Sequence, residues 1–212
     1  MEVRFRAWIP ALGLALAVSG PAGADPVSDA ETLVRAVWYE GLPAEAARDL
    51  SGPAIARLVE MLADPQEAPH HANIALALGY SGHRDAYPAL AALLATPLAG
   101  EVDRDAFRTQ TTTRLAMGQL ARRDPRALRW LLDAEQRGAA APAWHFRHHR
   151  GVALATLLEE QVLSALAISG APAARVRLDD AVAEARAATG PAESRRLRFA
   201  EAARARLGAE AP

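Results

Sequence analysis

Two pairs of adjacent histidines are the residues of this chain most suited to chemistry, because an imidazole binds divalent metals and transfers protons. They open two similar stretches, HHANIALALG at residues 70–79 and HHRGVALATL at residues 148–157. The shared Ala-Leu-Ala indicates packing in a repeated helix. If equivalent helices stack about 8–10 Å apart, the two pairs lie roughly 20 Å from each other. They cannot then share one metal, whose ligand bonds are about 2 Å long.

A metal site around the second pair alone is the alternative. Helical spacing would place His145, His148 and His149 at positions i, i+3 and i+4, where two imidazoles can hold a metal ion. A tetrahedral site needs more ligands, but the chain has no cysteine. The nearest downstream acids, Glu159 and Glu160, would lie about 15 Å along the axis. We therefore expect packed or groove-facing histidines, with no metal and no cofactor. A histidine-based divalent-metal binder or metal chaperone stays the alternative function.

Arginine provides the second kind of candidate site, because all 24 basic residues are Arg and none is Lys. Residues 25–103 carry 4 Arg against 12 acids, residues 104–150 carry 10 Arg against 4 acids, and residues 151–212 carry 8 of each. The first block is therefore acidic and the middle block basic. This pattern fits arginines that solvate helix faces or pair with acids of a neighbouring unit. It also permits head-to-tail self-association.

Three expected helix starts contain no acid: residues 70–80, 107–119 and 144–152. Equivalent helices of stacked pairs line one face, so these starts predict a continuous neutral-to-basic surface. A guanidinium can hold a carboxylate at two points, and we expect an acidic segment of a partner protein as the ligand. The residues expected on this surface are Arg108, Gln110, Thr112, His145, Arg147, His149 and Arg150.

Several function classes lack the residues that they need. P-loop and kinase sites require a lysine on the nucleotide phosphates, so HRD at residues 83–85 is a chance match to the kinase catalytic loop. The motifs G-x-S-x-G and H-E-x-x-H are absent. The adjacent acids Glu159-Glu160 and Asp179-Asp180 point about 100° apart on a helix, which is typical of solvated surface. We expect no enzyme. With a net charge of −1 and 5% aromatic residues, we also expect no nucleic-acid partner.

The elements that position these residues are predicted to be helices, because no stretch alternates β-branched apolar residues with polar ones as a strand does. Ser28 and Glu31 match a capping box for a helix that runs to Trp38. Proline favours the first turn of a helix. Further helix starts are expected at Pro43, Pro53, Pro69, Pro125 and Pro142. The fold class is therefore all-α.

A regular repeat organises these helices. TQTTTRLAMG at residues 109–118 lies midway between the two histidine-led stretches and aligns with both, so the step from His70 to Thr109 equals the step from Thr109 to His148. The preceding helices contain LVEML, LAALL and LRWLL, which begin at Leu58, Leu90 and Leu128 and are less evenly spaced. Such a unit predicts a short α-solenoid of stacked antiparallel helix pairs, since no unit buries its apolar face alone. The side chains expected between helices are Ile74, Leu76, Leu90, Leu93, Leu94, Leu115, Leu128, Leu131, Leu132 and Leu154.

The repeated segment resembles a known family. Residues 77–94 and 116–132 share a small residue and Gly ending one helix, a polar turn with Asp, and a Leu-rich helix with Pro near its start. These features are similar to HEAT repeats of the short lyase-associated type, over about residues 53–170. The resemblance implies a binding or assembly scaffold. Because some members assist or perform bilin attachment, an enzyme of that branch is the third possibility.

The number of repeats stays open in the sequence. Leu157 stands where the third unit should have its terminal Gly. LAISG at residues 166–170 is similar to LGYSG at residues 78–82, which permits a degenerate fourth turn. Residues 25–52 and 171–212 are expected to form N-terminal and C-terminal helical caps.

The first 24 residues are predicted to be a secretory signal peptide. A basic start with two arginines precedes an apolar run over residues 7–18, and Ala22-Gly23-Ala24 fits the A-x-A cleavage pattern. The run is shorter than the roughly 20 residues of a membrane-spanning helix. We expect cleavage before Asp25 and a periplasmic or secreted bacterial protein without stable membrane insertion. The expected function is a protein-binding or assembly scaffold of the cell envelope.

Overall fold

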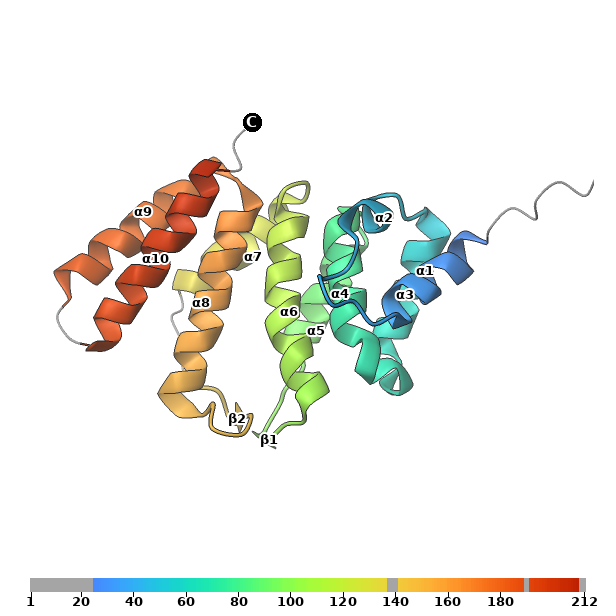
Figure 1. The fold of residues 1–212 in the computed structure, drawn as a ribbon, viewed down its shortest axis with the longest axis horizontal. Coiled ribbons are helices and arrows are strands. Elements are labelled where there is room, and N and C mark those ends of the chain that lie inside the picture. Colours follow the sequence, from blue (N-terminus) through green and yellow to red (C-terminus); the bar gives the residue numbers. More distant parts are fainter. Residues whose placement is uncertain (1–24, 137–140, 189–190, 210–212) are drawn as a thin grey trace, which may run out of the picture.

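The computed structural model describes residues 25–136, 141–188 and 191–209, and this part of the chain is mainly α-helical (Figure 1). Its α-helices are α1 (Pro26–Arg35), α2 (Ala44–Arg48), α3 (Gly52–Ala63), α4 (His71–Ser81), α5 (Ala86–Ala95), α6 (Arg104–Ala121), α7 (Pro125–Gln136), α8 (Gly151–Ser169), α9 (Pro172–Ala187) and α10 (Pro191–Ala209). A 3-10 helix, η1 (Pro65–His70), and two short strands, β1 (Gly100–Glu101) and β2 (Trp144–His145), join them. The all-α prediction is confirmed. The predicted signal peptide, residues 1–24, lies outside the described residues.

Helices α4, α6, α8 and α10 form a row in which each contacts the next, and Figure 1 shows them side by side. The helix that precedes each one in the chain packs against it: α3 on α4, α5 on α6, α7 on α8 and α9 on α10. Helices α1 and α2 cover the α3–α4 end of the row. The apolar stripe of every helix therefore finds a neighbouring helix, which is the condition for burying it.

Two glycines let neighbouring helices of the row approach closely. A Cβ on Gly79 would lie 2.6 Å from the carbonyl oxygen of Ala116, and a Cβ on Gly118 would lie 2.5 Å from that of Ala165. Both distances are shorter than real Cβ contacts, so the contacts of α4 with α6 and of α6 with α8 need glycine at these positions. The step from Gly79 to Gly118 equals the step from His70 to Thr109, as the repeat predicts.

Helix α8 ends later in the chain than the predicted alignment placed it. At the ends of α4 and α8, a serine hydroxyl donates to the carbonyl three residues earlier, at 2.7 Å for Ser81 and 2.6 Å for Ser169. Gly82 and Gly170 then cap these helices with φ of 64° and 67°. The predicted alignment placed the equivalent of Gly82 at Glu160, well before Gly170. Residues 166–170 therefore form the end of α8 and its cap, and they match the end of α4 at residues 78–82.

The first helix differs from its prediction at both ends. It begins at Pro26 rather than at Ser28, because the Asp25 side chain accepts the first free backbone N–H group at 3.2 Å. It ends at Arg35, so Trp38 lies in the connection to α2. The predicted capping box does not start this helix.

The other proline-led starts are confirmed in part. Pro69 lies inside η1, one turn before α4, because the chain makes a 3-10 turn there. Pro142 lies outside the described helices and precedes strand β2. The starts expected at Pro43, Pro53 and Pro125 correspond to the first turns of α2, α3 and α7.

The predicted core side chains are all at least partly buried. Ile74, Leu90, Leu131 and Leu154 have 0% exposure. The other six are half-buried, because they lie at the edges of the helix contacts: Leu76, Leu93, Leu94, Leu115, Leu128 and Leu132. Ile74 and Leu154 belong to helices of the row, and Leu90 and Leu131 belong to helices packed on it.

Two adjacent acids of α8 are partners in ion pairs, so the prediction of a solvated surface is wrong there. Glu160 is 7% exposed, and Arg195 donates to its two carboxylate oxygens at 2.7 and 2.9 Å. Nη2 of Arg196 lies 2.7 Å from a carboxylate oxygen of Glu159. Burial raises the pKa of the Glu159 carboxyl, and the nearby Arg196 partly opposes this. These ion pairs connect α10 with α8.

Helix α8 is also long and apolar enough to cross a membrane, judged by length and composition alone. It contacts α6, α7, α9 and α10, and it contains buried side chains such as Leu154, Leu163 and Leu166. A core helix surrounded by other helices has this same composition.

Candidate functional site

The residues predicted to form one basic surface do not share a face in the structure. Arg108 and Gln110 both lie on α6, but residues i and i+2 of a helix point about 160° apart. Arg108 is exposed, whereas Gln110 is 5% exposed and points toward α5, where it donates to the Leu93 carbonyl at 3.3 Å. Thr112 is half-buried. The prediction of one continuous neutral-to-basic surface is therefore wrong at Gln110.

The helix predicted over residues 144–152 is a strand and a tight turn. β2 pairs in parallel with β1, and Phe146 and His149 exchange backbone hydrogen bonds of 3.0 and 2.9 Å. Arg147 lies in this turn with a backbone φ of 53°. This left-handed conformation is uncommon for residues other than Gly or Asn. Helix α8 begins only at Gly151.

Aromatic packing explains why this segment is not helical. The ring of Phe107 on α6 stacks on Phe146 at 4.5 Å and on His149 at 5.7 Å, and meets Trp144 edge-on at 6.4 Å. Trp144 is 8% exposed. An extended chain followed by a turn brings all these rings to one side chain of α6, which a helix could not do.

This turn removes the geometry on which the metal alternative depended. His145 lies in β2 and His149 at the end of the turn, so the three histidines do not have helical i, i+3, i+4 spacing. The rings of His148 and His149 are 4.3 Å apart. Among the described residues, no group of three or more His, Cys, Asp or Glu is arranged to hold a metal.

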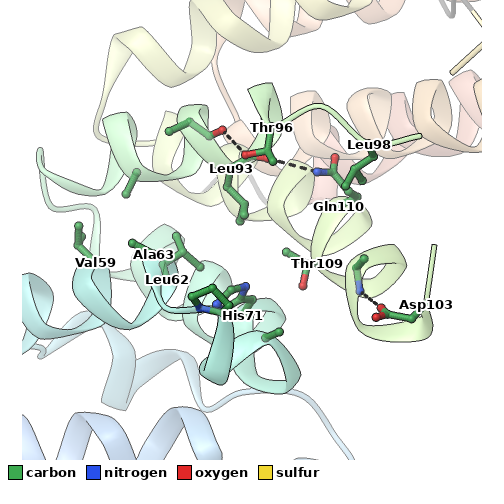
Figure 2. A pocket seen from close by; sticks show the side chains of 15 residues that line it. Val59, Leu62, Ala63, His71, Leu93, Thr96, Leu98, Asp103, Thr109 and Gln110 are labelled. Carbon is green, nitrogen blue, oxygen red and sulfur yellow. Dashed lines mark hydrogen bonds between the residues drawn. The ribbon is translucent and has the colours of Figure 1, made fainter. Parts of the chain in front are cut away.

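A pocket of about 570 Å³ lies between α3, η1, α5 and α6 (Figure 2). Most of its walls are apolar. The lining residues are Val59, Leu62, Ala63, Pro65, Ala68, His71, Ala89, Ala92, Leu93, Thr96, Leu98, Asp103, Ala106, Thr109 and Gln110. Ala63, Ala92 and Asp103 are exposed, so the pocket opens on the surface. This volume is within the range of ligand sites in proteins, about 300–1,000 Å³.

The sequence prediction missed this pocket, although α5 carries a signal for it. Residues 86–95 contain no charged side chain, and alanine occupies several of their outward positions. Ala89 and Ala92 are too small to fill the space between α5 and α3, and Ala106 leaves room on α6. A helix that is apolar on its outer face indicates a surface that receives another apolar group.

The polar groups of the pocket are held in place by hydrogen bonds. Nε2 of His71 lies 3.0 and 3.2 Å from two backbone carbonyl oxygens, so this nitrogen carries the proton. The Thr96 hydroxyl donates to a carbonyl of its own helix at 3.1 Å. Asp103 accepts a backbone N–H of α6 at 2.7 Å as the helix N-cap. Figure 2 shows these side chains around the pocket.

Gln110 is fixed from two sides. Its amide donates to the Leu93 carbonyl, and its Oε1 accepts from Nη1 of Arg114 at 3.1 Å. Burial lowers the pKa of the Arg114 guanidinium to about 10, which still leaves it charged at neutral pH. Arg114 therefore supports the wall of the pocket from the next turn of α6.

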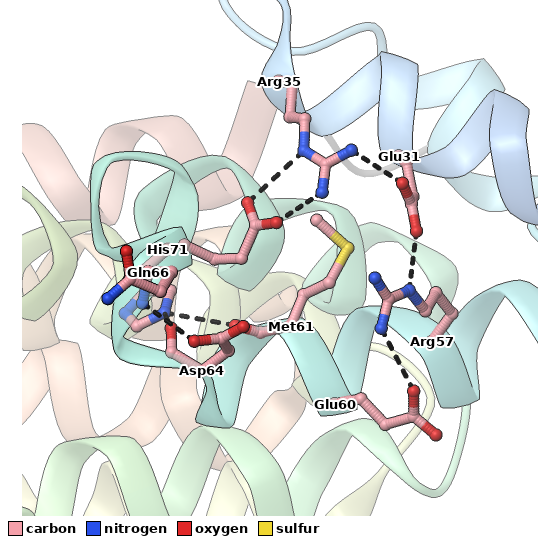
Figure 3. Close-up of polar contacts among 9 residues, drawn as sticks. Glu31, Arg35, Arg57, Glu60, Met61, Asp64, Gln66 and His71 are labelled. Atoms are coloured by element: carbon pink, nitrogen blue, oxygen red, sulfur yellow. Dashed lines mark hydrogen bonds and ion pairs between the residues drawn. The ribbon is translucent and has the colours of Figure 1, made fainter.

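Ion pairs join η1, which forms one wall of the pocket, to α1, and join α1 to α3 (Figure 3). Arg35 of α1 forms ion pairs with Glu67 of η1 and with Glu31, the latter at 2.6 Å. Arg57 of α3 pairs with Glu31 at 2.6 Å and with Glu60 at 3.3 Å. The hydrogen bond from Arg57 lowers the pKa of Glu31, and the one from Arg35 lowers the pKa of Glu67.

These lowered pKa values predict that the ion pairs add stability at neutral pH and not in acid. A carboxyl with a lowered folded pKa stabilises the fold above its unfolded pKa of about 4.5, and this contribution is lost as the pH falls through the folded pKa. Arg35→Gln should therefore lower the free energy of unfolding at pH 7, by less than about 1 kcal/mol because the pairs are near solvent. Urea unfolding at pH 7 and pH 3 measures this.

The control for this prediction is Arg48→Gln, which removes an exposed pair with Glu45 inside α2. It should change stability less than Arg35→Gln at pH 7. A loss from Arg35→Gln that is the same at pH 7 and pH 3 would contradict the ionic explanation.

Comparisons of the chain with protein families, with curated proteins and with solved structures found no match. The pocket is the feature that combines a cavity of ligand size with polar groups in fixed positions.

Proposed function

We propose that this protein is a non-catalytic binding scaffold made of HEAT-like helix pairs, and that its pocket receives an apolar segment of a partner protein. The observation that carries the proposal is the surface pocket of about 570 Å³ between α3, η1, α5 and α6. Repeat proteins commonly bind through surfaces formed between successive units. A few apolar side chains of a partner would fill the space that the alanines leave.

The arrangement of helices supports the solenoid part of the proposal. Gly79 and Gly118 occupy equivalent positions in α4 and α6, and the Ser-Gly turns at Ser81 and Ser169 end α4 and α8 in the same way. Equivalent contacts between successive units are the defining property of a solenoid. We take residues 53–170 as the repeat region, with residues 25–52 and 171–212 as its caps.

The pocket proposal predicts that a bulky side chain at Ala92 blocks binding. Ala92 is an exposed lining residue, so Ala92→Trp should occupy the pocket without disturbing the core, and it should weaken partner binding at least about tenfold. Ala95→Trp is the matched control, because Ala95 is exposed on the same helix but does not line the pocket. The partner is first identified by photo-crosslinking from Leu98 in the native host, and its affinity is then measured by titration calorimetry. Equal affinities for both variants would refute the proposal.

We also propose that the protein works outside the cytoplasm, in a bacterial periplasm or the medium. The support is the basic start, apolar run and Ala22-Gly23-Ala24 of the sequence. The mature protein should begin at Asp25, and Ala24→Leu should leave more than about nine-tenths of the chain unprocessed, since the cleavage site needs a small residue. N-terminal sequencing of exported material tests this, and Met1 at its N-terminus would contradict it.

The predicted binding of an acidic partner segment to the arginine surface is separate from the pocket proposal and stays a prediction. Arg108, Arg147 and Arg150 are exposed and form no ion pair with other described residues. The guanidinium of Arg147 lies 5.1 Å from the centre of the Phe146 ring, a cation–π distance that helps to hold it. Among the predicted residues, Gln110 belongs to the pocket and not to this surface.

A further inference from the structure

We propose that the segment received by the pocket is basic and amphipathic, with apolar side chains between α3 and α5 and an Arg or Lys side chain at Asp103. This inference rests on the proposed function of the pocket and adds the chemistry of its occupant. It differs from the sequence prediction, which expected an acidic ligand on another surface.

The hydrogen-bonding groups of the pocket favour a ligand that brings donors. The Nε2 donor of His71 is used on two backbone carbonyls, so Nδ1 is an acceptor whenever the ring is neutral. The hydroxyl proton of Thr96 is used on Ala92, and one amide hydrogen of Gln110 is used on Leu93. The donors that stay open on the lining side chains are the Thr109 hydroxyl and the second amide hydrogen of Gln110, and both are neutral.

Asp103 adds a negative charge that no described residue neutralises. Its Oδ1 accepts the backbone N–H of Ala106, and Asp103 forms no ion pair with a described residue. It is the one carboxylate among the lining residues, and no guanidinium lines the pocket. The N-terminus of α6 contributes about +0.5 of a charge, which is less than the full charge of Asp103. Among the side chains that line the pocket, the balance of charge is therefore negative.

The charge of the surrounding chain has the same sign. Residues 52–103, which supply most of the lining, carry two Arg and six acids. One of these two, Arg57, is already paired with Glu31 and Glu60. A basic segment would be attracted toward this region, and the attraction would weaken with salt. An acidic segment would meet an unpaired carboxylate and few donors.

The test uses the full chain and two synthetic amphipathic peptides of equal length with the same Leu and Ala positions, one with Arg and one with Glu on the polar helix face. Fluorescence anisotropy at low salt should show the Arg peptide binding at least about tenfold more tightly than the Glu peptide. Ala92→Trp should weaken binding of the Arg peptide at least about tenfold, and Ala95→Trp should leave it unchanged.

Asp103→Asn tests the position of the cation. Asn is as good an N-cap as Asp, so the start of α6 should persist while the charge is removed. The Arg peptide should bind about two- to fivefold more weakly, as expected for loss of an exposed ion pair. Asp105→Asn removes the same charge from the first turn of α6 outside the lining and is the matched control. Circular dichroism confirms that each variant is folded.

The possible outcomes separate the two proposals. Equal binding of both peptides, sensitive to Ala92→Trp, would overturn the basic occupant and keep the pocket as a binding site. Equal weakening by Asp103→Asn and Asp105→Asn would show attraction by net charge and overturn the placement at Asp103. Two outcomes would overturn this inference and count against the proposed pocket function. One is an Arg-peptide affinity that Ala92→Trp leaves unchanged, and the other is no binding of either peptide.

Discussion

Gly118→Ala is expected to destabilise the protein by about 2–3 kcal/mol, although alanine is the better helix former by about 1 kcal/mol. The added Cβ would lie 2.5 Å from the carbonyl oxygen and 2.7 Å from the Cα of Ala165. These are backbone atoms of α8, so no side-chain rotation relieves the contact and the two helices must separate. Chemical denaturation followed by circular dichroism measures the loss.

Gly52→Ala is the matched control for this prediction. Gly52 is the first residue of α3, and a Cβ there meets no atom within 4 Å. The control should therefore stay within about 0.5 kcal/mol of the parent. Gly79→Ala should behave like Gly118→Ala, because its Cβ would lie 2.6 Å from the Ala116 carbonyl oxygen. If Gly118→Ala were as stable as the control, the close packing of α6 on α8 would be wrong.

Glu135→Ala is expected to cost about 3 kcal/mol, the lower end for breaking a buried ion pair. The Glu135 side chain is fully buried at the end of α7 and accepts two hydrogen bonds from Arg177 of α9, whose side chain is 16% exposed. Removing the carboxylate leaves this guanidinium largely desolvated. The hydrogen bonds to Glu135 are the main cause of the raised pKa of Arg177.

Glu184→Ala is the control, because Glu184 also pairs with Arg177, at 3.0 Å, but has a 51% exposed side chain. It should cost less than about 1 kcal/mol. Glu135→Gln keeps the size of the side chain and removes the charge, so it separates packing from ionic pairing. Equal free energies of unfolding for Glu135→Ala and Glu184→Ala would contradict the assigned difference in burial.

Helix α6 connects the stability of the protein with its proposed binding site. Its C-terminal half carries Gly118 in the row of helices, and its N-terminal half carries Thr109 and Gln110 in the wall of the pocket. The two halves have different neighbours, so Gly118→Ala and Ala92→Trp should have separable effects, the first on unfolding and the second on partner affinity.

The all-α class, most of the helices and the equal step that relates Gly79 to Gly118 follow from the sequence alone. Apolar residues at helical intervals and the Ser-Gly turns are local signals, and each helix can bury its stripe against the next whatever the exact register. Gly79 and Gly118 have the predicted spacing because close approach of two backbones requires glycine at equivalent positions.

The end of α8 and the positions of the candidate residues depend on tertiary contacts that the sequence does not reveal. Residues 144–149 have a histidine spacing that also suits a helix. The stacking of Phe146 on Phe107 of α6 favours the strand and turn instead. Gln110 enters the pocket because the alanines of α5 leave space beside it, and Glu160 is buried because Arg195 of another helix reaches it. Each outcome depends on a side chain from a distant part of the sequence, and local propensity contains no information about that side chain.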